Sequence, residues 1–363
     1  MLAQGGICVL RDESDYDSYF EDTMRAGHYE NRKESVDIMI RSSRDVINDL
    51  LNFGVRFAKN PDGSLAYTRE GAHSRPRICF HEDITGKEIT TTLLSHVKKC
   101  SNVTILEYTT MTDILVDDGK CTGMVAETKE GETLHIHADN TIMATGGIGG
   151  LYEHSTNFPI LTGDACRIAK EHGVELEHMD YVQIHPTCLY SKKPGRSFLI
   201  SESARGEGAV LLNHKGERFV NELLPRDVVT KAIQEEMKKE GVEYEWISFA
   251  HVPKEIILKH FPHIYEKCLE EGYDLLKEPA PIVPAQHYFM GGVHVNRDSA
   301  TTMPNLYAVG ETSCNGVHGK NRLASNSLLE SLVFAKRAAV KIQNEEKGNE
   351  DHEFESNYHA ACC

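Results

Sequence analysis

The sequence lacks the features that mark several protein classes. No segment is apolar over the length that a membrane span requires, and the first fifteen residues, MLAQGGICVLRDESD, have neither the basic region nor the long apolar region of a secretory signal. Positive charge is also scarce, because 39 Lys and Arg residues stand against 55 Asp and Glu residues, which gives a formal net charge of -16. This excess of acid argues against nucleic acids and anionic membranes as partners, since both require a basic surface.

The cysteines form no pattern typical of a metal site or a disulfide framework. All ten are scattered, and no two have the C-x-x-C spacing of zinc, iron–sulfur or redox sites. Without an export signal, we expect reduced thiols in a cytoplasmic protein that has no metal site. His135 and His137 alternate onto one face of an expected strand, but without further ligands a packed or solvated strand face is the better interpretation.

Length and periodicity give the expected organisation. The 363 residues suggest two domains, and an apolar content of 40% is enough for a sizeable core. The middle section, residues 179–287, is expected to be irregular apart from its helices. Helices are predicted within residues 15–51 and at 90–99, 163–171, 228–240, 254–260 and 264–271, and strands in VTILEY, DILVDDGKCTGMVAET, TLHIHADNTIMATGG and NLYAVGET. LLESLVFAKRAAVKI predicts an amphipathic helix, with fraying expected after Gln343.

Two strand-to-loop motifs carry the first chemical signal. NTIMATGGIGG runs from a short apolar strand into glycines, and TTMPNLYAVGET ends a second strand at Gly310 and Glu311. Each motif also has an ordinary structural interpretation. The first can be a plain strand-to-loop turn, and Glu311 in the second can be a capping or loop glutamate. A helix that begins near Ser327 adds free N–H groups and a partial positive charge, which stabilise an anion or an electron-rich carbonyl. Together, these features predict the second half of a flavin site.

The middle section supplies candidate substrate ligands in loops marked by glycine or proline. Taken singly, each is more often a solvated residue or part of a structural ion pair. As a set, they combine arginine guanidinium groups with imidazole and hydroxyl donors, and this combination predicts a pocket for a dicarboxylate. The candidates are His185, Ser201, Glu202, Arg205, Glu207, Arg226, His287 and Arg322.

These motifs, taken in order, resemble those of one family. Ten motifs stand in family order between the first residues and about Gln343. They are AQGGI, TREGAHSRPR, ATGG, TGDA, HPT, ARGEGA, PRD, HYFMGGV, YAVGE and NRLASNSLLE. On these residues the chain resembles the L-aspartate oxidases, within the superfamily of fumarate reductase and succinate dehydrogenase flavoproteins. The resemblance implies a flavoprotein oxidoreductase with FAD as its cofactor and L-aspartate as its dicarboxylate substrate.

The resemblance also assigns roles to individual residues. Arg226 matches the family's proton-transfer arginine, and Glu70 in TREGAHS matches an acid that can pair with the substrate ammonium. Ser201 stands where the family has threonine, and its hydroxyl can still donate. FAD contacts are implied for Ala3, Gln4, Gly5, Gly6, Asp164, Glu311, Ser327 and Leu328, and contacts with the substrate carboxylates for His185, Ser201, His287 and Arg322.

The implied reaction is the oxidation of L-aspartate to iminoaspartate by hydride transfer to the flavin, with oxygen or fumarate as the electron acceptor. This is the first step of de novo NAD biosynthesis through quinolinate, which makes quinolinate synthase a candidate partner. A flavoprotein of the fumarate reductase or succinate dehydrogenase type is the alternative enzyme. Glu70 favours the oxidase, because succinate and fumarate carry no ammonium.

Two family features are not found in the sequence. The family opens with a strand and a G-x-G-x-x-G loop for the FAD pyrophosphate and adds a C-terminal helical domain, whereas this chain starts at MLAQGG and ends in a short acidic tail. We therefore expect an α/β fold with an incomplete Rossmann-like FAD-binding domain (1–178 and 289–347), an inserted α+β capping domain (179–288) and a polar tail (348–363). A truncated, non-catalytic remnant of the oxidase is the alternative to an active enzyme.

Overall fold

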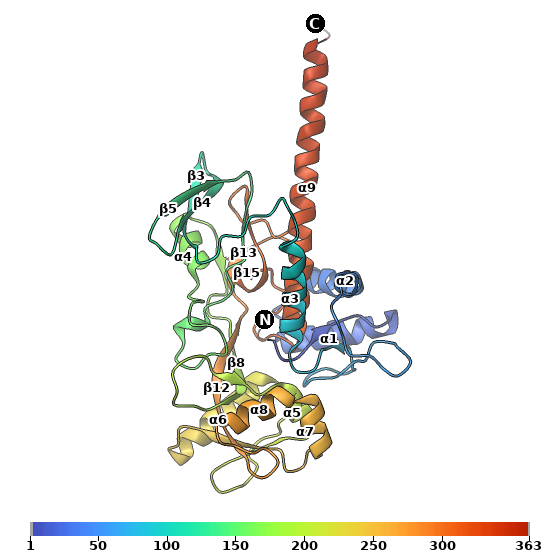
Figure 1. The fold of residues 1–363 in the computed structure, drawn as a ribbon, viewed down its shortest axis with the longest axis vertical. Coiled ribbons are helices and arrows are strands. Elements are labelled where there is room, and N and C mark those ends of the chain that lie inside the picture. Colours follow the sequence, from blue (N-terminus) through green and yellow to red (C-terminus); the bar gives the residue numbers. More distant parts are fainter. Residues whose placement is uncertain (1–2, 362–363) are drawn as a thin grey trace.

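The computed structural model describes residues 3–361, with side chains as far as residue 347. A first group of elements comprises β1 (Ile7–Cys8), η1 (Glu13–Asp15), α1 (Tyr16–Ala26), α2 (Lys33–Asn52), β2 (Ile78–Cys79), α3 (Thr85–Val97) and the beginning of α9 (Asn326–Ala361). In Figure 1, α1 and α2 lie beside the lower part of α9. The predicted helical region therefore forms two helices, and α3 begins five residues earlier than the predicted helix at Thr90.

The apolar spacing of α2 explains how this first group packs. Met39, Ile40 and Val46 recur at helical spacing, so they share one face of the helix. That face is buried in a core that also contains Val333 and Phe334 of α9. Burial of each such side chain contributes about 1.5–3 kcal/mol relative to exposure.

A second group of elements contains small sheets. β3 and β4 form an antiparallel hairpin whose Asp118–Gly119 turn lies where the D-G pair predicted it, and β5 continues the sheet with His135 and His137 exposed. A parallel pair, β6 and β14, forms a separate two-stranded sheet. The elements are β3 (Thr110–Asp117), β4 (Lys120–Glu127), β5 (Thr133–His137), β6 (Thr141–Met143), η2 (Gly149–Leu151), α4 (Asp164–Glu171), β7 (Leu176–Glu177), β13 (Gly292–His294), β14 (Leu306–Ala308), η3 (Gly310–Thr312) and β15 (Ser313–Cys314).

The third group of elements corrects the expectation of an irregular middle section. Its strands form an antiparallel sheet of order β10-β11-β12-β8-β9, and α5–α8 surround this sheet at the base of Figure 1. The sequence did not reveal the strands because many of their residues are buried on both faces, so the polar alternation of a half-exposed strand is absent. The elements are β8 (Val182–Leu189), β9 (Phe198–Leu199), α5 (Glu202–Gly206), β10 (Val210–Leu212), α6 (Arg226–Glu240), β11 (Glu245–Ser248), α7 (Lys254–His260), α8 (Pro262–Glu270) and β12 (Ala280–Phe289).

One predicted strand is wrong. The segment VTILEY, residues 103–108, is irregular and includes a turn at residues 107–108, and Val103, Ile105 and Leu106 are 44%, 43% and 50% exposed. A β-strand requires a hydrogen-bonded neighbour, and among residues 3–361 this segment has none. The apolar residues of this segment do not form a strand, because no neighbouring strand of the described chain pairs with them.

The helix α9 also differs from the prediction. It continues through Ala361, past Gln343, and in Figure 1 it extends well beyond the rest of the molecule. Lys and Glu are good helix formers, and the pair Lys341–Glu345, at 2.9 Å, has the favourable i,i+4 spacing. These preferences explain why the helix does not end where its apolar stripe ends.

A single carboxylate connects the first and third groups. Asp83 is 2% exposed, and its Oδ2 accepts hydrogen bonds from the backbone N–H groups of His263 and Ile264, each at 3.2 Å. These N–H groups belong to the first turn of α8, where they have no partner within the helix. Asp83 therefore caps a helix that lies about 180 residues further along the chain.

The fold class is the predicted one, a mixed α/β architecture. The third group has its own core, which runs from Leu189 to Ile282. This separation is in keeping with an inserted domain at 179–288, although the domain boundaries stay a prediction. No helix among the described residues combines the length and the apolar character needed to cross a membrane.

Candidate active site

A cavity of about 330 Å³ lies where the three groups of elements meet. It brings together residues predicted for cofactor and for substrate, from both ends and the middle of the chain. Asp164, Arg205 and Glu207 are the exceptions, because none of them lines the cavity. Asp164 begins α4 and accepts a hydrogen bond from Thr162. The predicted residues in the lining are Ala3, Gln4, Gly5, Gly6, Glu70, His185, Ser201, Glu202, Arg226, His287, Glu311, Arg322, Ser327 and Leu328.

The two glycine-rich loops lie next to each other because their strands are paired. β6 and β14 are parallel, with Met143 opposite Ala308, so both loops leave the same edge of the sheet. There, Glu311 Oε1 accepts a hydrogen bond from the N–H of Phe289 at 3.0 Å. A Cβ on Gly147 would lie 2.4 Å from this oxygen, so only glycine lets the carboxylate take this position. Burial raises the pKa of Glu311 to about 7.

The first turn of α9 forms another wall of the cavity, through Ser327 and Leu328. The start of the helix is anchored on α1, because the hydroxyl of Tyr19 donates to Asn326 Oδ1 at 2.8 Å and Asn326 Nδ2 donates to Thr23 Oγ1 at 3.2 Å. The N–H groups of a first turn lack partners within the helix and lie at the positive end of its dipole. This wall therefore suits an anionic or electron-rich group.

The N-terminal segment approaches the site closely because it contains two glycines. A Cβ on Gly6 would lie 2.2 Å from the carbonyl oxygen of Cys79, and one on Gly5 would lie 2.5 Å from Glu70 Oε1. The neighbouring Gln4 has a buried side-chain oxygen without a hydrogen-bond partner in the described part of the chain. Unpaired buried oxygens are rare in folded proteins, so this one is a candidate contact for a bound group.

Two histidines on adjacent strands present donors to the cavity. The rings of His185 and His287 are 5.2 Å apart between centroids. His185 Nδ1 accepts a hydrogen bond from the N–H of Thr187 at 3.2 Å, so Nε2 carries the proton, and this buried atom has no partner among residues 3–361. His287 Nδ1 lies 2.7 Å from the hydroxyl of Thr156. Burial and the charge of Arg226 lower the pKa of both rings well below the usual value, so both rings are neutral.

Arg322 is a buried charge without a described carboxylate partner, and its guanidinium lies 4.8 Å from the centroid of the Tyr288 ring. It is 4% exposed, yet its Nη1 lies only at 3.5 Å from the carbonyl of Leu323, and its Nε has no partner in the described structure. No carboxylate among the described side chains forms an ion pair with it. Burial, followed by the charge of Arg226, lowers its pKa to about 10, which still leaves it charged at neutral pH. A buried, unpaired cation beside two imidazole donors is the expected arrangement for an anion site.

Arg226 belongs to a row of buried charges. Its Nε donates to Glu202 Oε2 at 2.5 Å, and its Nη1 donates to Gln183 Oε1 at 3.0 Å. Arg205 Nη2 lies 3.7 Å from the same oxygen of Glu202. Burial would raise the pKa of Glu202, but the charges of the two arginines outweigh it and lower the pKa. Glu202 is therefore an ionised group in direct contact with Arg226.

Glu70 also lines the cavity and is 4% exposed. Its Oε2 accepts a hydrogen bond from Ser325 Oγ at 2.6 Å, and its Oε1 accepts one from Ser203 Oγ at 3.2 Å. Burial, followed by the nearby charge of Glu202, raises the pKa of Glu70. A cation placed beside this carboxylate would favour its charged form.

Several of these partners were not predicted from the sequence. Ser203 and Ser325 donate hydrogen bonds to Glu70. Gln183 contacts Arg226, and its Nε2 donates to the backbone carbonyl oxygen of Arg322 at 2.8 Å. Thr156 orients His287. The signal for Ser203 was available, since it stands two positions after Ser201 at a helix start, where Ser201 accepts from the N–H of Ser203. The others depend on contacts between distant parts of the chain, which no local motif indicates.

Comparison with known proteins first defines the class. The family model described as "FAD binding domain" matches residues 1–328, so the chain is an FAD-binding flavoprotein. It is 51% identical to an L-aspartate oxidase of Clostridium perfringens, over 94% of this chain and 78% of the relative, and 49% identical to one of Clostridium acetobutylicum, over 94% and 79%. The chain belongs to the L-aspartate oxidase family. A solved structure of an E. coli quinol fumarate reductase variant is 31% identical, with a TM-score of 0.86, and the match covers 97% of this chain and 66% of that one.

The residues of the cavity fit the FAD that this family uses. The close approach allowed by Gly5, Gly6 and Gly147 and the unpaired oxygen of Gln4 are features of a surface built for a bound group. Glu311 provides an acceptor for hydroxyl groups, and the start of α9 provides donors. These residues would hold the flavin beside Arg322 and the two histidines.

Proposed function

We propose that the chain catalyses the FAD-dependent oxidation of L-aspartate to iminoaspartate, the first step of NAD biosynthesis through quinolinate. The observation that carries this proposal is the buried, unpaired guanidinium of Arg322 in a cavity that also contains an oppositely charged carboxylate, Glu70. L-Aspartate has the matching pattern, because it presents two carboxylates and one ammonium. The bound flavin supplies the hydride acceptor.

The substrate carboxylates are bound by donors that the fold leaves free. Arg322 provides a cationic fork, His185 provides the proton on Nε2, and the Ser201 hydroxyl stands at the start of α5. Charged hydrogen bonds of this kind are about twice as strong as neutral ones, and two-pronged binding also fixes orientation. These contacts hold the substrate Cα in one position relative to the FAD-binding wall, and this positioning is a large part of catalysis.

The proton chemistry falls to Arg226 and Glu202. The oxidation removes a hydride from Cα and a proton from the substrate nitrogen, so the site needs a route for that proton. Arg226 reaches the cavity, and its Nε is bonded to the ionised Glu202, which can accept a proton passed through the guanidinium. Contact with Glu202 is what makes an arginine usable here, since an isolated guanidinium holds its proton to high pH.

A fumarate reductase or succinate dehydrogenase activity is the second candidate, because the similarity to the fumarate reductase structure includes almost the whole chain. The two reactions differ at Glu70. Succinate and fumarate offer no cation to this buried carboxylate, whereas the ammonium of L-aspartate does. Glu70 therefore favours the amino acid.

Three wider assignments belong to the same proposal. Oxygen or fumarate would reoxidise the flavin. Quinolinate synthase is the candidate partner, since an imine hydrolyses in water and benefits from rapid consumption. A cytoplasmic location is in keeping with the described cysteines, which are all free thiols. The capping domain at 179–288 would open and close over the cavity, because the site is shared between it and the rest of the chain.

The test is an FAD titration of the purified chain, followed by anaerobic addition of L-aspartate while the flavin absorbance is recorded. Saturable binding and bleaching by L-aspartate, but not by succinate, support the oxidase. Bleaching by succinate with no response to L-aspartate supports the second candidate. A folded chain that does not bind FAD would indicate the non-catalytic alternative. Glu70→Gln is the matched variant, and it should impair bleaching by L-aspartate while leaving FAD binding unchanged.

A further inference from the structure

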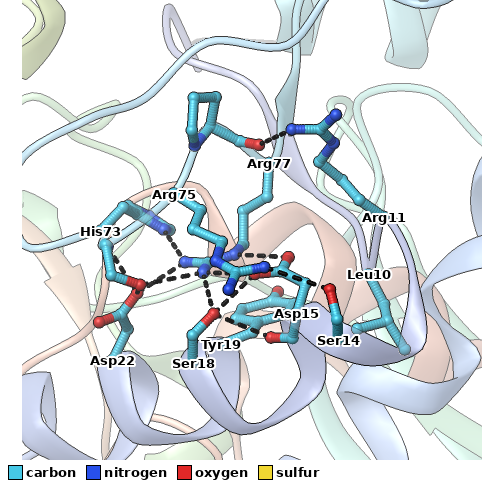
Figure 2. A network of polar contacts seen from close by, with 12 residues as sticks. Leu10, Arg11, Ser14, Asp15, Ser18, Tyr19, Asp22, His73, Arg75 and Arg77 are labelled. Atoms are coloured by element: carbon cyan, nitrogen blue, oxygen red, sulfur yellow. Dashed lines mark hydrogen bonds and ion pairs between the residues drawn. The ribbon is translucent and has the colours of Figure 1, made fainter.

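A second cluster of buried charge surrounds Arg77, outside the cavity (Figure 2). Arg77 is 0% exposed and donates to Asp15 at 2.9 and 3.1 Å and to Asp22 at 2.7 Å. Its guanidinium lies over the ring of Tyr19, 4.9 Å from the centroid. Burial would raise the pKa of both aspartates, but hydrogen bonds from Arg77 to Asp15, and from the Ser74 N–H and Arg77 to Asp22, hold both pKa values below the usual range. The guanidinium is therefore fixed by two ionised carboxylates.

This fixed guanidinium determines the tautomer of a histidine. His73 Nδ1 lies 3.0 Å from Arg77 Nη1, which can only donate, so Nδ1 is the acceptor. The proton must then be on Nε2, which donates to the carbonyl oxygen of Ala324 at 3.0 Å. Burial lowers the pKa of His73 to about 4, so the ring is neutral and has one defined donor. Figure 2 shows this ring beside Arg77.

The residue after Ala324 connects this cluster to the cavity. Ser325 has φ of 63°, a strained backbone conformation for serine, so its position depends on the contacts that hold it. Its Oγ accepts from the N–H of Gly6 at 3.1 Å and donates to Glu70 Oε2 at 2.6 Å. The N–H of His73 also bonds to the carbonyl of Glu70, at 3.3 Å. His73 thus supports both the loop that carries Glu70 and the loop that carries its hydrogen-bond donor.

We propose that His73 and Arg77 are positioning residues that fix the orientation of Glu70 toward the substrate ammonium, and that they thereby set the preference for an amino dicarboxylate over a plain one. Neither side chain lines the cavity, so both act through Ser325 and Glu70. This inference rests on the proposed function, because it requires that Glu70 meets an ammonium.

The test compares two substitutions at one position. His73→Asn leaves an acceptor for Arg77 but is too short to donate to Ala324, whereas His73→Gln extends a donor toward the former Nε2 position. Each FAD-loaded variant is assayed for L-aspartate oxidation and, with a reduced dye, for fumarate reduction. We expect His73→Asn to lower kcat/KM for L-aspartate about tenfold and to change fumarate reduction less than about twofold. His73→Gln should remain close to the unmodified chain in both assays.

A second variant and a binding measurement keep the test decisive if His73→Asn fails to fold. Ser325→Ala removes the hydrogen bond to the Glu70 carboxylate without altering His73, and it should shift the ratio of the two activities in the same direction. Calorimetric titration with L-aspartate and with succinate should show the same change in relative affinity. Equal losses for both substrates, or no loss, would overturn the positioning role. An unmodified chain that reduces fumarate but does not oxidise L-aspartate would overturn the proposed function, and this inference with it.

Discussion

The two buried charge clusters of this molecule differ in how completely their polar groups are satisfied. Around Arg77, the guanidinium nitrogens all have partners, and the two aspartates are held by several donors each. In the cavity, Arg322 Nε and His185 Nε2 are buried without partners in the described structure. Folding alone rewards complete pairing, so the unpaired groups indicate where a ligand completes the network. Similar residue types therefore serve stability in one place and binding in the other.

The largest effect is expected from Arg226→Gln, which tests whether the cavity cluster is catalytic as well as binding. Loss of the proton route should reduce kcat for L-aspartate oxidation and for fumarate reduction about a thousandfold, within the range for general acid–base groups. Steady-state kinetics of both reactions measure this. The control is Arg218→Gln, which breaks an ion pair with Glu222 at a side chain that is 58% exposed. A reduction of less than tenfold would remove Arg226 from the mechanism.

Arg77→Met tests whether the fully paired cluster around Arg77 stabilises the fold. Removal of the guanidinium leaves Asp15 and Asp22 buried without their counter-charge, so the free energy of unfolding should fall by about 3–5 kcal/mol. Urea titration followed by circular dichroism measures this change. Arg56→Met is the control, because its pair with Glu88 involves an arginine that is 74% exposed and should contribute about 1 kcal/mol or less. Equal midpoints for Arg77→Met and the unmodified chain would mean that this cluster is not structural.

Arg322→Met should separate binding from stability. No described carboxylate loses a partner, so the ligand-free chain should unfold at an unchanged or slightly higher urea concentration. The dissociation constant for succinate should rise about a hundredfold, because a charged hydrogen-bonding fork is lost. Calorimetry and urea titration on the same samples check both parts. Lys320→Met, an exposed cation in the same loop, should alter neither. A strong loss of stability would show that Arg322 has a structural partner after all.

The smallest effect is expected at Glu330, a buried acid on α9. Burial raises the pKa of this side chain from its usual 4.5 to about 7. The folded chain holds this proton more tightly than the unfolded chain, so Glu330 lowers stability as the pH rises from about 4.5 to 7. Glu330→Gln should stabilise the protein by about 1–3 kcal/mol at pH 8 and by little at pH 4.5. Urea titrations at both pH values test this, with the exposed Glu346→Gln as the control. An identical gain at both pH values would contradict the raised pKa.

The sequence predicted the helices and hairpins whose signals are local. The apolar stripe of α2 and the Asp118–Gly119 turn lie where expected, because spacing and turn chemistry determine them within a few residues. The antiparallel sheet of the middle section was missed and the strand at VTILEY was wrong, because strand formation depends on a partner elsewhere in the chain. The periodicity of one segment cannot report whether that partner is present.

The candidate site shows the same difference between features with a local sequence signal and features that depend on distant residues. Family motifs identified Arg322, His185 and Glu311, and these residues do meet in one cavity. The network around Arg77 was not predicted, since Asp15 and Asp22 lie 62 and 55 residues from their arginine and carry no motif. Long-range pairing of ordinary charged residues has no local signature, so its members look like solvated surface residues until the fold is known.

The cap that Asp83 provides for α8 makes the folding of one part of the chain depend on another. An excised fragment 179–288 would keep its own apolar core, but the first turn of α8 would lose its acceptor, at a cost of about 0.5–2 kcal/mol. In the intact chain, this helix is completed only when the segment around Asp83 reaches it. A fragment 179–288 transplanted into another protein would therefore need a new acceptor for the first turn of α8.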